Sequence, residues 1–381
     1  MHILIAPNTF KHSLDAAAAA KAIERGLRSG CPSCTTTCCP VGDGGDGTGL
    51  LLMEALQGIP VTHTVHDPLG RKIQASYGWI GNDTAVIEMA SASGIRLLKT
   101  EELDPLRASS FGTGELMLHA LNRGARKILL CVGGSATVDG GCGILQALGV
   151  RFTDKEQKEI SDLPAQLDEL DGIDVSSMHA RIQECELVIL CDVNNPLLGE
   201  RGAARVFGPQ KGATPAQVDL LERRLHRLQQ VILKISGKDI GTMPHGGAAG
   251  GVVAGVCALA GAKAVNGIDF FLDAVLFDQA LACSNLVITG EGSIDLQTLE
   301  GKAPYGVAVR ARKKNIPVIA LTGKMPDGAN AELLKYFQQI IPINQKNISL
   351  NEALSSAEKN LENKAQEIAL QPGFFNMHNQ Q

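Results

Sequence analysis

The sequence contains few aromatic residues and no large excess of either charge. Phe, Trp and Tyr make up 4% of 381 residues, and 35 Lys and Arg face 40 Asp and Glu, which gives a formal net charge of -5. Without a positive excess, the chain has no field that would gather nucleic acid or anionic lipid. A hydrophobic fraction of 44% is that of an ordinary globular protein, and the length suits two or three domains.

A segment suited to cross a membrane is also lacking. The longest uncharged stretch, residues 240–262, contains Pro244, His245 and seven glycines, which make a poor membrane helix. The first residues carry no basic leader and reach Pro7 and Asn8 too soon for the apolar core of a signal peptide. We therefore expect a soluble cytoplasmic protein that binds neither membranes nor nucleic acid.

The ten cysteines of the sequence do not form a recognisable metal site. Cys31, Cys34, Cys38 and Cys39 are close in sequence, but Cys38 and Cys39 lie in an expected strand, where neighbouring side chains point to opposite faces. Four zinc ligands need a compact arrangement. We therefore expect ordinary reduced thiols, as in most cytoplasmic proteins.

Short apolar runs alternate with amphipathic segments along much of the chain, which is typical of α/β proteins. Strands are expected at residues 3–6, 35–41, 127–132, 186–192, 286–289, 318–322 and 340–343. Ser13 is expected to cap a helix that ends near Gly30. Residues 60–89 alternate polar and apolar side chains between turns, which predicts an antiparallel meander.

Both ends of the chain have the same α/β texture. We therefore predict two α/β domains, of which one is discontinuous. Residues 1–62 and 285–381 would form a Rossmann-like domain, and residues 63–284 would form an inserted α/β domain that contains the meander.

Polar or glycine-rich turns follow five of the expected strands. These turns are residues 8–13, 42–47, 133–137, 192–195 and 290–293. Ligands of open α/β sheets bind beyond the carboxyl ends of the strands. The turns therefore predict a binding site, although glycines and caps of this kind also occur in α/β proteins for packing alone.

The loop at residues 42–47 permits two interpretations. Gly42, Gly44 and Gly47 match G-x-G-x-x-G, the fingerprint of dinucleotide binding. Asp43 and Asp46, however, place two carboxylates where a pyrophosphate would lie. Carboxylates in such a loop suit a substrate hydroxyl or Mg²⁺ better than NAD.

The turn after the strand at residues 127–132 is suited to hold an anion. Gly133 and Gly134 let backbone N–H groups turn inward, and Ser135 and Thr137 add hydroxyl donors. Close packing of a helix through small residues is the alternative explanation. The sequence has no G-x-x-x-x-G-K-[S/T] motif, so a nucleotide is not held by a Walker A loop.

Acidic side chains follow two further strands. Asp192 and Asn194 are spaced for Mg²⁺ ligation or for activation of a hydroxyl, or alternatively for an Asx turn. Glu291 and Asp295 form a similar pair. The cations that could neutralise phosphate are Lys11, Arg71, Lys211 and Lys302. Acids, an amide cradle and cations are what phosphoryl transfer needs.

Eight longer motifs carry a family resemblance. They are APNTFKHSL at residues 6–14, GDGGDGT at 42–48, DPLGR at 67–71, GTGEL at 112–116, GGSATVDGG at 133–141, CDVNNPL at 191–197, FGPQKGA at 207–213 and ITGEGSID at 288–295. In this order they resemble the motifs of the bacterial glycerate kinase family over nearly the whole chain. One departure is Asn8, where the family usually has Asp.

The resemblance implies ATP-dependent phosphorylation of D-glycerate with Mg²⁺, on a two-domain fold of the glycerate kinase type. The family is linked to the 2-hydroxyl, so 2-phosphoglycerate is the expected product. A glycerate 3-kinase and a kinase of a related small hydroxy acid remain alternatives. From other classes, an NAD-dependent dehydrogenase and a sugar-acid-binding regulator remain open, and a homodimer is compatible with the sequence.

Roles follow as hypotheses from this resemblance. The catalytic residues would be Asp192, which accepts the proton or orients the attacking hydroxyl, and Lys11, which neutralises the transferred phosphate. Substrate-binding residues would be Ser13, Asp43, Arg71 and Asn194. Phosphate or nucleotide would be held by Gly133, Gly134, Ser135, Thr137, Lys211, Gly290 and Glu291. Asp43 and Asp295 would hold Mg²⁺.

Overall fold

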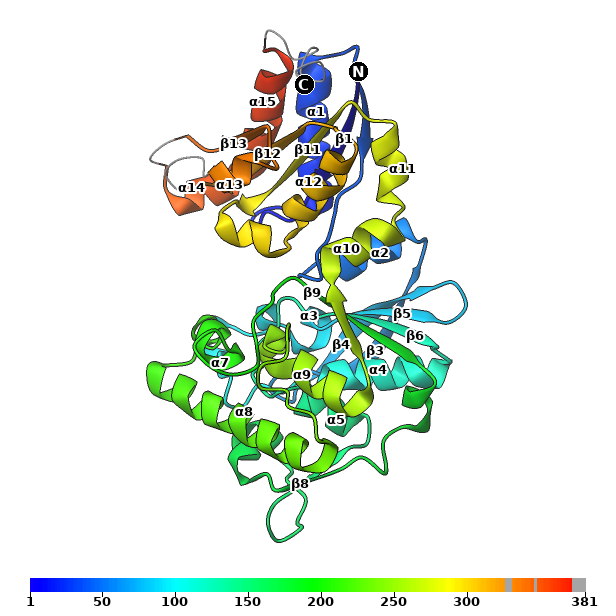
Figure 1. The fold of residues 1–381 in the computed structure, drawn as a ribbon, viewed down its shortest axis with the longest axis vertical. Helices are drawn as coiled ribbons and strands as arrows, with labels where there is room; N and C mark the ends of the chain where they lie inside the picture. Colours follow the sequence, from blue (N-terminus) through cyan, green and yellow to red (C-terminus); the bar gives the residue numbers. More distant parts are fainter. Residues whose placement is uncertain (326–330, 346–347, 372–381) are drawn as a thin grey trace. The chain divides into compact units, whose positions relative to one another are not determined.

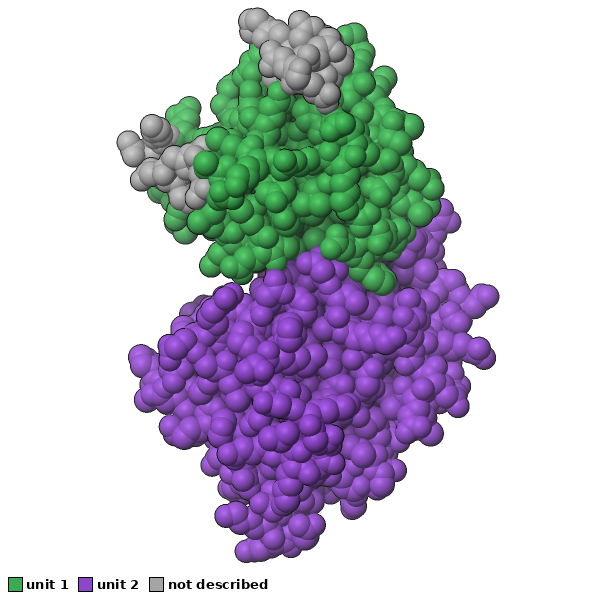
Figure 2. Space-filling view, viewed as in Figure 1, with its two compact units in different colours: residues 1–43, 268–381 green, residues 44–267 purple. Residues whose placement is uncertain are grey.

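The structure is a computed structural model that describes residues 1–325, 331–345 and 348–371. The chain groups into two compact units, shown in separate colours in Figure 2. The first unit comprises residues 1–43 and 268–381, and the second comprises residues 44–267. These limits lie before the predicted domain boundaries at 62/63 and 284/285, which stay a prediction.

The first unit is built on a parallel sheet. In the described part of the chain its strand order is β13-β12-β11-β1-β2, and every neighbouring pair is parallel (Figure 1). The strands are β1 (His2–Pro7), β2 (Thr35–Cys38), β11 (Leu286–Ser293), β12 (Val318–Lys324) and β13 (Gln339–Pro342). The helices are α1 (Ala16–Gly30), α11 (Phe277–Ala282), α12 (Ala303–Lys313), α13 (Ala331–Leu334), α14 (Leu350–Ser355) and α15 (Ala357–Ala369), with the 3₁₀ helix η6 (Leu296–Glu300). Residues 3–6 of β1 and 286–288 of β11 are apolar because both faces of a parallel sheet are covered.

The second unit contains a larger mixed sheet. Its strand order is β10-β9-β6-β5-β4-β3, with antiparallel pairing from β3 to β5 and parallel pairing elsewhere. The strands are β3 (Ile59–His66), β4 (Lys72–Ile80), β5 (Thr84–Glu88), β6 (Lys127–Cys131), β9 (Glu186–Cys191) and β10 (Lys263–Asn266), and a separate hairpin pairs β7 (Arg151–Thr153) with β8 (Gly172–Asp174).

The helices of the second unit cover this sheet and extend beyond it. They are α2 (Thr48–Ala55), α3 (Ala90–Ser93), α4 (Phe111–Arg123), α5 (Cys142–Ala147), α6 (Leu163–Gln166), α7 (Ala203–Phe207), α8 (Pro215–Ser236) and α9 (Ala248–Ala260), with 3₁₀ helices η1 (Ile95–Leu97), η2 (Thr100–Glu102), η3 (Leu167–Glu169), η4 (Ala180–Gln183) and η5 (Pro209–Lys211). Helix α10 (Gly267–Ala274) starts at the last residue of the second unit, and its other residues belong to the first unit. The α/β fold class predicted from the sequence is confirmed. In the described residues, no helix is both long and apolar enough to cross a membrane.

The start of α1 corrects one expectation. Ser13 was predicted to cap this helix, but the helix begins at Ala16 and its N-cap is Asp15, whose side chain accepts a hydrogen bond from the Ala18 N–H at 2.7 Å. The Ser13 hydroxyl instead donates to the Phe10 carbonyl at 3.0 Å. Aspartate and serine are similarly good caps, and the turn from Phe10 to Leu14 delays the helix until Asp15 takes that place.

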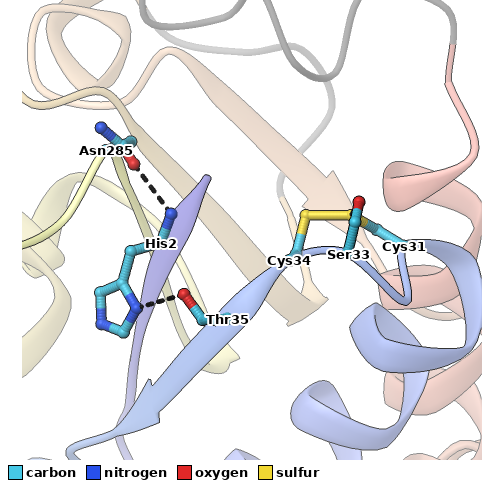
Figure 3. The surroundings of a disulfide bond; sticks show 6 residues. All are labelled: His2, Cys31, Ser33, Cys34, Thr35 and Asn285. Atoms are coloured by element: carbon cyan, nitrogen blue, oxygen red, sulfur yellow. Dashed lines mark hydrogen bonds between the residues drawn. A yellow bond between two sulfur atoms is a disulfide. The ribbon is translucent and has the colours of Figure 1, made fainter.

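The end of α1 corrects a second expectation. Cys31 and Cys34 were predicted to be reduced thiols, but they form a disulfide, with 5.5 Å between their Cα atoms (Figure 3). The turn between the end of α1 and the start of β2 brings the two residues together. Cys38 and Cys39 are free, and burial raises the pKa of each thiol to about 11. In the residues that the structure describes, no three His, Cys, Asp or Glu side chains could hold a metal ion.

His2, the first residue of β1, contacts two other segments of the first unit (Figure 3). Its backbone N–H donates to the Asn285 side-chain oxygen at 2.8 Å, and its ring nitrogen Nδ1 lies 2.8 Å from the Thr35 hydroxyl. His2 therefore links β1 to the residues that precede β11 and to β2. The contact with Asn285 joins residues that are 283 positions apart in the sequence.

Helices α1 and α15 pack side by side in the first unit (Figure 1). A Cβ atom added at Gly26 would lie 2.1 Å from the Glu362 carbonyl oxygen, and one added at Gly30 would lie 2.7 Å from the Gln366 carbonyl oxygen. Glycine at these positions therefore lets the two helix backbones approach each other closely. Arg25 adds exposed ion pairs to Glu358 and Glu362 at the rim, where such pairs contribute little.

The close contact at Gly26 predicts whether a substitution there raises or lowers the stability of the protein. Helix propensity alone would make Gly26→Ala stabilising by about 1 kcal/mol. Because the added methyl group meets a backbone carbonyl, we expect the opposite, a loss of roughly 1–3 kcal/mol in the free energy of unfolding. Urea unfolding of Gly26→Ala, with exposed Lys21→Ala on the same helix as the control, checks this. A Gly26→Ala variant more stable than the wild type would contradict the packing.

Candidate functional site

Polar side chains of the first unit gather where its two central strands end. β1 and β11 are parallel neighbours, and Pro7 pairs with Gly290. Asn8 follows β1 directly, and its N–H donates to the Gly290 carbonyl at 2.8 Å. The sequence predicted that the strand would end at Thr289, but β11 continues to Ser293, so Gly290 and Glu291 belong to the strand and not to a turn.

The Asp43 carboxylate is held in place by two donors. The Asn8 amide donates to Oδ2 at 2.9 Å, and the Ala303 N–H donates to the same oxygen at 3.3 Å. Ala303 is the first residue of α12, where the helix dipole favours a negative charge. Asp43 is only 6% exposed. An aspartate at position 8 would face Asp43 with a second carboxylate, so asparagine allows this contact without a cation.

Glu291 is a buried carboxyl group. It is 7% exposed, and the Thr298 hydroxyl donates to its Oε1 atom at 3.0 Å. Burial raises the pKa of Glu291 to about 7, with Asp43 raising it further and the charges of Lys302 and Lys11 lowering it. The group can therefore take up or release a proton near neutral pH. Such a group suits proton transfer or positioning better than the phosphate-binding role predicted for it.

The other predicted residues of this unit lie around the same strand ends. The Lys11 backbone nitrogen is 3.3 Å from the place that a Cβ atom of Gly292 would take, so the loop after β1 lies against β11. Asp295 caps the 3₁₀ helix η6, and its Oδ1 accepts from the Gln297 N–H at 2.9 Å. A Cβ atom at Gly290 would lie 2.3 Å from the Leu321 carbonyl oxygen, so strand packing alone requires this glycine.

A buried lysine defines the candidate site of the second unit. The Lys211 ammonium donates to the Ser135 hydroxyl oxygen at 2.8 Å and to the Thr137 carbonyl at 2.7 Å. Lys211 is 3% exposed, and burial lowers its pKa to about 7, partly opposed by the charge of Asp139. The Thr137 hydroxyl is buried without a hydrogen-bond partner. A buried ammonium group with neutral contacts and a buried hydroxyl group without a partner are suited to bind an anion.

The turn that carries these donors is fixed by its own packing. A Cβ atom at Gly133 would lie 2.4 Å from the Gly45 Cα atom, and Gly134 has a φ of +69°, which suits glycine. Asp139 then ties the turn to α4 and α5, because its Oδ2 accepts from the Ser110 N–H at 2.8 Å and from the Gly143 N–H at 3.3 Å. Packing explains Gly133 and Gly134, whereas Ser135 and Thr137 remain as the ligand-facing candidates.

Asp192 and Asn194 follow the buried strand β9, in a loop that a histidine supports. The His245 ring nitrogen Nδ1 donates to the Val193 carbonyl at 2.7 Å, which leaves Nε2 as the accepting nitrogen. His245 has a φ of +64°, uncommon for a residue with a side chain. No motif in the sequence singles out His245, because positive φ values cannot be read from the residue type.

Arg71 lies in a separate salt-bridge network of the second unit. Its Nε donates to the Asp67 carboxylate, and its Nη1 donates to Glu102 at 2.7 Å. Asp67 is almost fully buried and also accepts from the Leu69 N–H at 2.8 Å. The guanidinium thus holds a turn, and a role toward a substrate carboxylate stays a prediction.

The predicted residues therefore form groups within each unit. The first unit brings Lys11, Asp43 and Glu291 to the ends of β1 and β11. In the second unit, Ser135, Thr137 and Lys211 are in direct contact, whereas Arg71 has other partners. Sequence reasoning named Lys302 only as one of four cations that could neutralise phosphate, and Asn8 only as a departure from the family motif, so neither was among the predicted site residues.

The burial of Lys211 predicts an unusual pH dependence of stability. The lysine pKa is about 7 in the folded chain and about 10.4 in the unfolded one, so the unfolded chain binds the extra proton between these values. The penalty is therefore largest below pH 7 and fades as the pH rises toward 10. The free energy of unfolding of Lys211→Met, relative to that of wild type, should therefore be roughly 2–3 kcal/mol higher at pH 6 than at pH 9. Urea unfolding at both values, with exposed Lys234→Met as control, tests this; an equal difference at both would refute it.

The burial of Glu291 predicts the opposite pH dependence, a stability that falls as the pH rises. Its folded pKa of about 7 lies above the unfolded value near 4.3, so the folded chain holds the extra proton between them and wild-type stability falls as the pH rises through this window. At pH 8, Glu291→Gln should therefore be more stable than wild type. The difference in free energy of unfolding between them, in favour of the variant, should be roughly 3 kcal/mol larger at pH 8 than at pH 4.5. Thermal or urea unfolding checks this against exposed Glu352→Gln. If the difference in stability between Glu291→Gln and wild type does not change with pH, the pKa of Glu291 is not raised.

Comparisons with known proteins agree on one family. The glycerate kinase family model matches residues 3–371. The chain is 42% identical to a glycerate kinase of Halalkalibacterium halodurans and 41% identical to the glycerate 2-kinase of Escherichia coli, in each case over 97% of both chains. The crystal structure of a candidate glycerate kinase 2 from Salmonella typhimurium LT2 superposes with a TM-score of 0.81, at 40% identity over 97% of both chains. With the family model and these relatives spanning nearly its whole length, this chain belongs to the glycerate kinase family.

Proposed function

We propose that this chain transfers a phosphoryl group from ATP to the 2-hydroxyl of D-glycerate and so forms 2-phosphoglycerate. The observation that carries the proposal is the similarity to the E. coli protein named glycerate 2-kinase, which extends over 97% of both chains. Membership of a kinase family supports the use of ATP. A cytoplasmic location is part of the proposal, because the reaction needs a compartment that holds ATP.

The turn at residues 133–137 is the proposed phosphate cradle. The Lys211 ammonium has three N–H donors, of which two are used by Ser135 and Thr137. The third donor and the unpartnered Thr137 hydroxyl are available for phosphate oxygens. In a site with little water, such contacts stabilise the charge that phosphoryl transfer spreads over the equatorial oxygens.

Asp192 is the proposed acceptor of the proton from the attacking hydroxyl. It follows β9 directly, so a rigid strand fixes its backbone, and the bond from His245 to Val193 holds the next residue of the loop. Asn194 is proposed to orient the substrate from the same loop. Lys11 and Ser13 would act from the loop after β1, where Lys11 lies against β11.

Mg²⁺ is the proposed companion of ATP, and the chemistry of the available donors fits it. Asp43 and Asp295 present carboxylate oxygens at the strand ends of the first unit, and Mg²⁺ is commonly held by one or two carboxylates together with phosphate oxygens and water. Bound there, Mg²⁺ would neutralise part of the phosphate charge.

The proposal predicts which coupled assay gives a signal. The chain is incubated with ATP, Mg²⁺ and D-glycerate, and enolase is added without phosphoglycerate mutase. Because enolase acts on 2-phosphoglycerate, we expect phosphoenolpyruvate to appear in the ultraviolet absorbance at once. A signal only after mutase is added would mean phosphorylation of the 3-hydroxyl, and none with either enzyme would remove D-glycerate as the substrate.

An Asp192→Asn variant supplies the control for the mechanism. Loss of the proton acceptor should lower kcat by roughly 10²–10⁴-fold, the range of general base catalysis, while unfolding in urea stays unchanged. The matched control is Asp219→Asn, an exposed position on α8. Near-normal turnover of Asp192→Asn would exclude Asp192 as the base.

A further inference from the structure

Residues 245–251 form a short segment that contacts two parts of the candidate site in the second unit. At its start, the His245 ring nitrogen Nδ1 donates to the Val193 carbonyl at 2.7 Å. Two residues later, the Gly247 N–H donates to the Asn195 carbonyl at 2.9 Å. The start of the segment is therefore paired with the loop that follows β9.

The other end of the segment contacts the turn that holds the buried lysine. The Gly250 carbonyl accepts from the Gly140 N–H at 3.0 Å. A Cβ atom added at Gly250 would lie 2.0 Å from the Thr137 carbonyl oxygen, the same oxygen that accepts from the Lys211 ammonium at 2.7 Å. One short segment therefore connects the loop that carries Asp192 with the turn that holds Lys211.

The backbone of this segment takes a conformation that side chains disfavour. His245 and Ala249 have φ values of +64° and +53°, and Gly250 and Gly251 have values of +69° and +94°. The left-handed region costs free energy for a residue with a Cβ atom, and such residues persist where their surroundings hold them. Glycine at position 245 would take this φ without strain, but it would lose the hydrogen bond of the ring. The backbone conformation therefore gives no reason for histidine here, whereas the contact with Val193 does.

The hydrogen bond to Val193 acts on both polar residues of the loop. Val193 lies between Asp192 and Asn194, and its carbonyl belongs to the planar peptide group that it shares with Asn194. A donor that fixes this oxygen therefore fixes the orientation of the whole peptide group. Strand β9 holds Asp192 from the other side, because its last residue, Cys191, pairs with Asn266 of β10. Asp192 thus lies between two fixed points of the backbone.

We propose that His245 is a positioning residue of phosphoryl transfer. Through the Val193 carbonyl, it holds the loop that carries Asp192 in a fixed place relative to the turn in which Lys211 is buried. The inference rests on the proposed kinase function for the reaction that it serves. It adds a residue that acts through the loop and not on the substrate.

Phosphoryl transfer depends strongly on this kind of positioning. The attacking hydroxyl and the phosphoryl group must meet in line, and the protein contributes mainly by placing them and by neutralising charge. Displacement of one partner by about 1 Å lowers the rate by roughly 100-fold. Binding of ATP alone depends on the phosphate turn. Loss of the His245 contact should therefore affect turnover and leave the affinity for ATP unchanged.

The test compares two substitutions at position 245 with a matched control. His245→Gly removes the ring and suits the positive φ, and His245→Asn keeps a shorter donor on a residue that tolerates this φ. The control is Gln157→Gly, because Gln157 has a φ of +62° in an exposed turn of the same unit. The kcat, the KM for D-glycerate and the calorimetric affinity for ATP are measured for each variant. Urea unfolding checks that each is folded, and His245→Asn takes the place of His245→Gly if the latter is not.

We expect His245→Gly to lower kcat roughly 10- to 100-fold without a change in the affinity for ATP. The kcat of His245→Asn should lie between that of His245→Gly and that of wild type. Turnover of His245→Gly equal to that of Gln157→Gly would overturn the inference. A parallel loss of kcat and of affinity for ATP would also overturn it, because it would show a general loosening of the site.

Hydrogen exchange separates this inference from the proposed function, because it needs no substrate. His245→Gly should speed the exchange of amide protons in residues 192–197 and 245–251, whereas Gln157→Gly should not. Unchanged exchange in these two segments would overturn the inference. If the wild type phosphorylates D-glycerate and His245→Gly does so with unchanged kcat, the inference is wrong and the kinase function stands. If the wild type does not use D-glycerate but exchange still rises in these segments, His245 positions the loop and the substrate is wrong.

Discussion

A lysine ammonium group buried against two neutral oxygens is the interaction on which this account depends. Lys211 contacts the Ser135 hydroxyl and the Thr137 carbonyl, and no carboxylate is within hydrogen-bond distance of it in the described residues. Burial of this charge without a negative partner lowers the free energy of unfolding. A bound anion would supply the negative charge, so the protein is less stable without its ligand because the site is already formed.

The first unit repeats this principle with the opposite charge. Glu291 is buried at the end of a central strand, and two lysines act on it without touching it. Parallel topology makes the arrangement possible, because β1 and β11 are neighbours whose carboxyl ends meet at one edge of the sheet. The Asp43 contact with Ala303 then directs the start of α12 to the same edge.

The sequence predicted the regular elements well where one strong local signal decided them. Apolar runs located β6 and β12, because a short continuous apolar run is typical of a buried strand. Two features failed where local signals compete: Asp15 caps α1 instead of Ser13, and Cys31 pairs with Cys34 although the two were expected to be reduced.

Much of the site could not be predicted, because burial is set by tertiary packing. In the sequence, Lys211 looks like any surface lysine, and only the fold shows that its ammonium is covered. Likewise, the positive φ of His245 has no signal in its residue type. The sequence indicated that position 133 requires glycine, and the structure shows that the reason is close packing of the backbone. The candidate donors to a ligand are the side chains of Ser135 and Thr137 in the same turn.

The most direct test of this account is the proton balance of ligand binding. ATP is titrated into the wild-type protein at pH 8 in two buffers with different ionisation enthalpies. Because the pKa of Lys211 is about 7, its amine is mostly neutral at this pH, and an anion beside it should raise that pKa. We predict uptake approaching about one proton for each ATP bound. The same heat of binding in both buffers would contradict it.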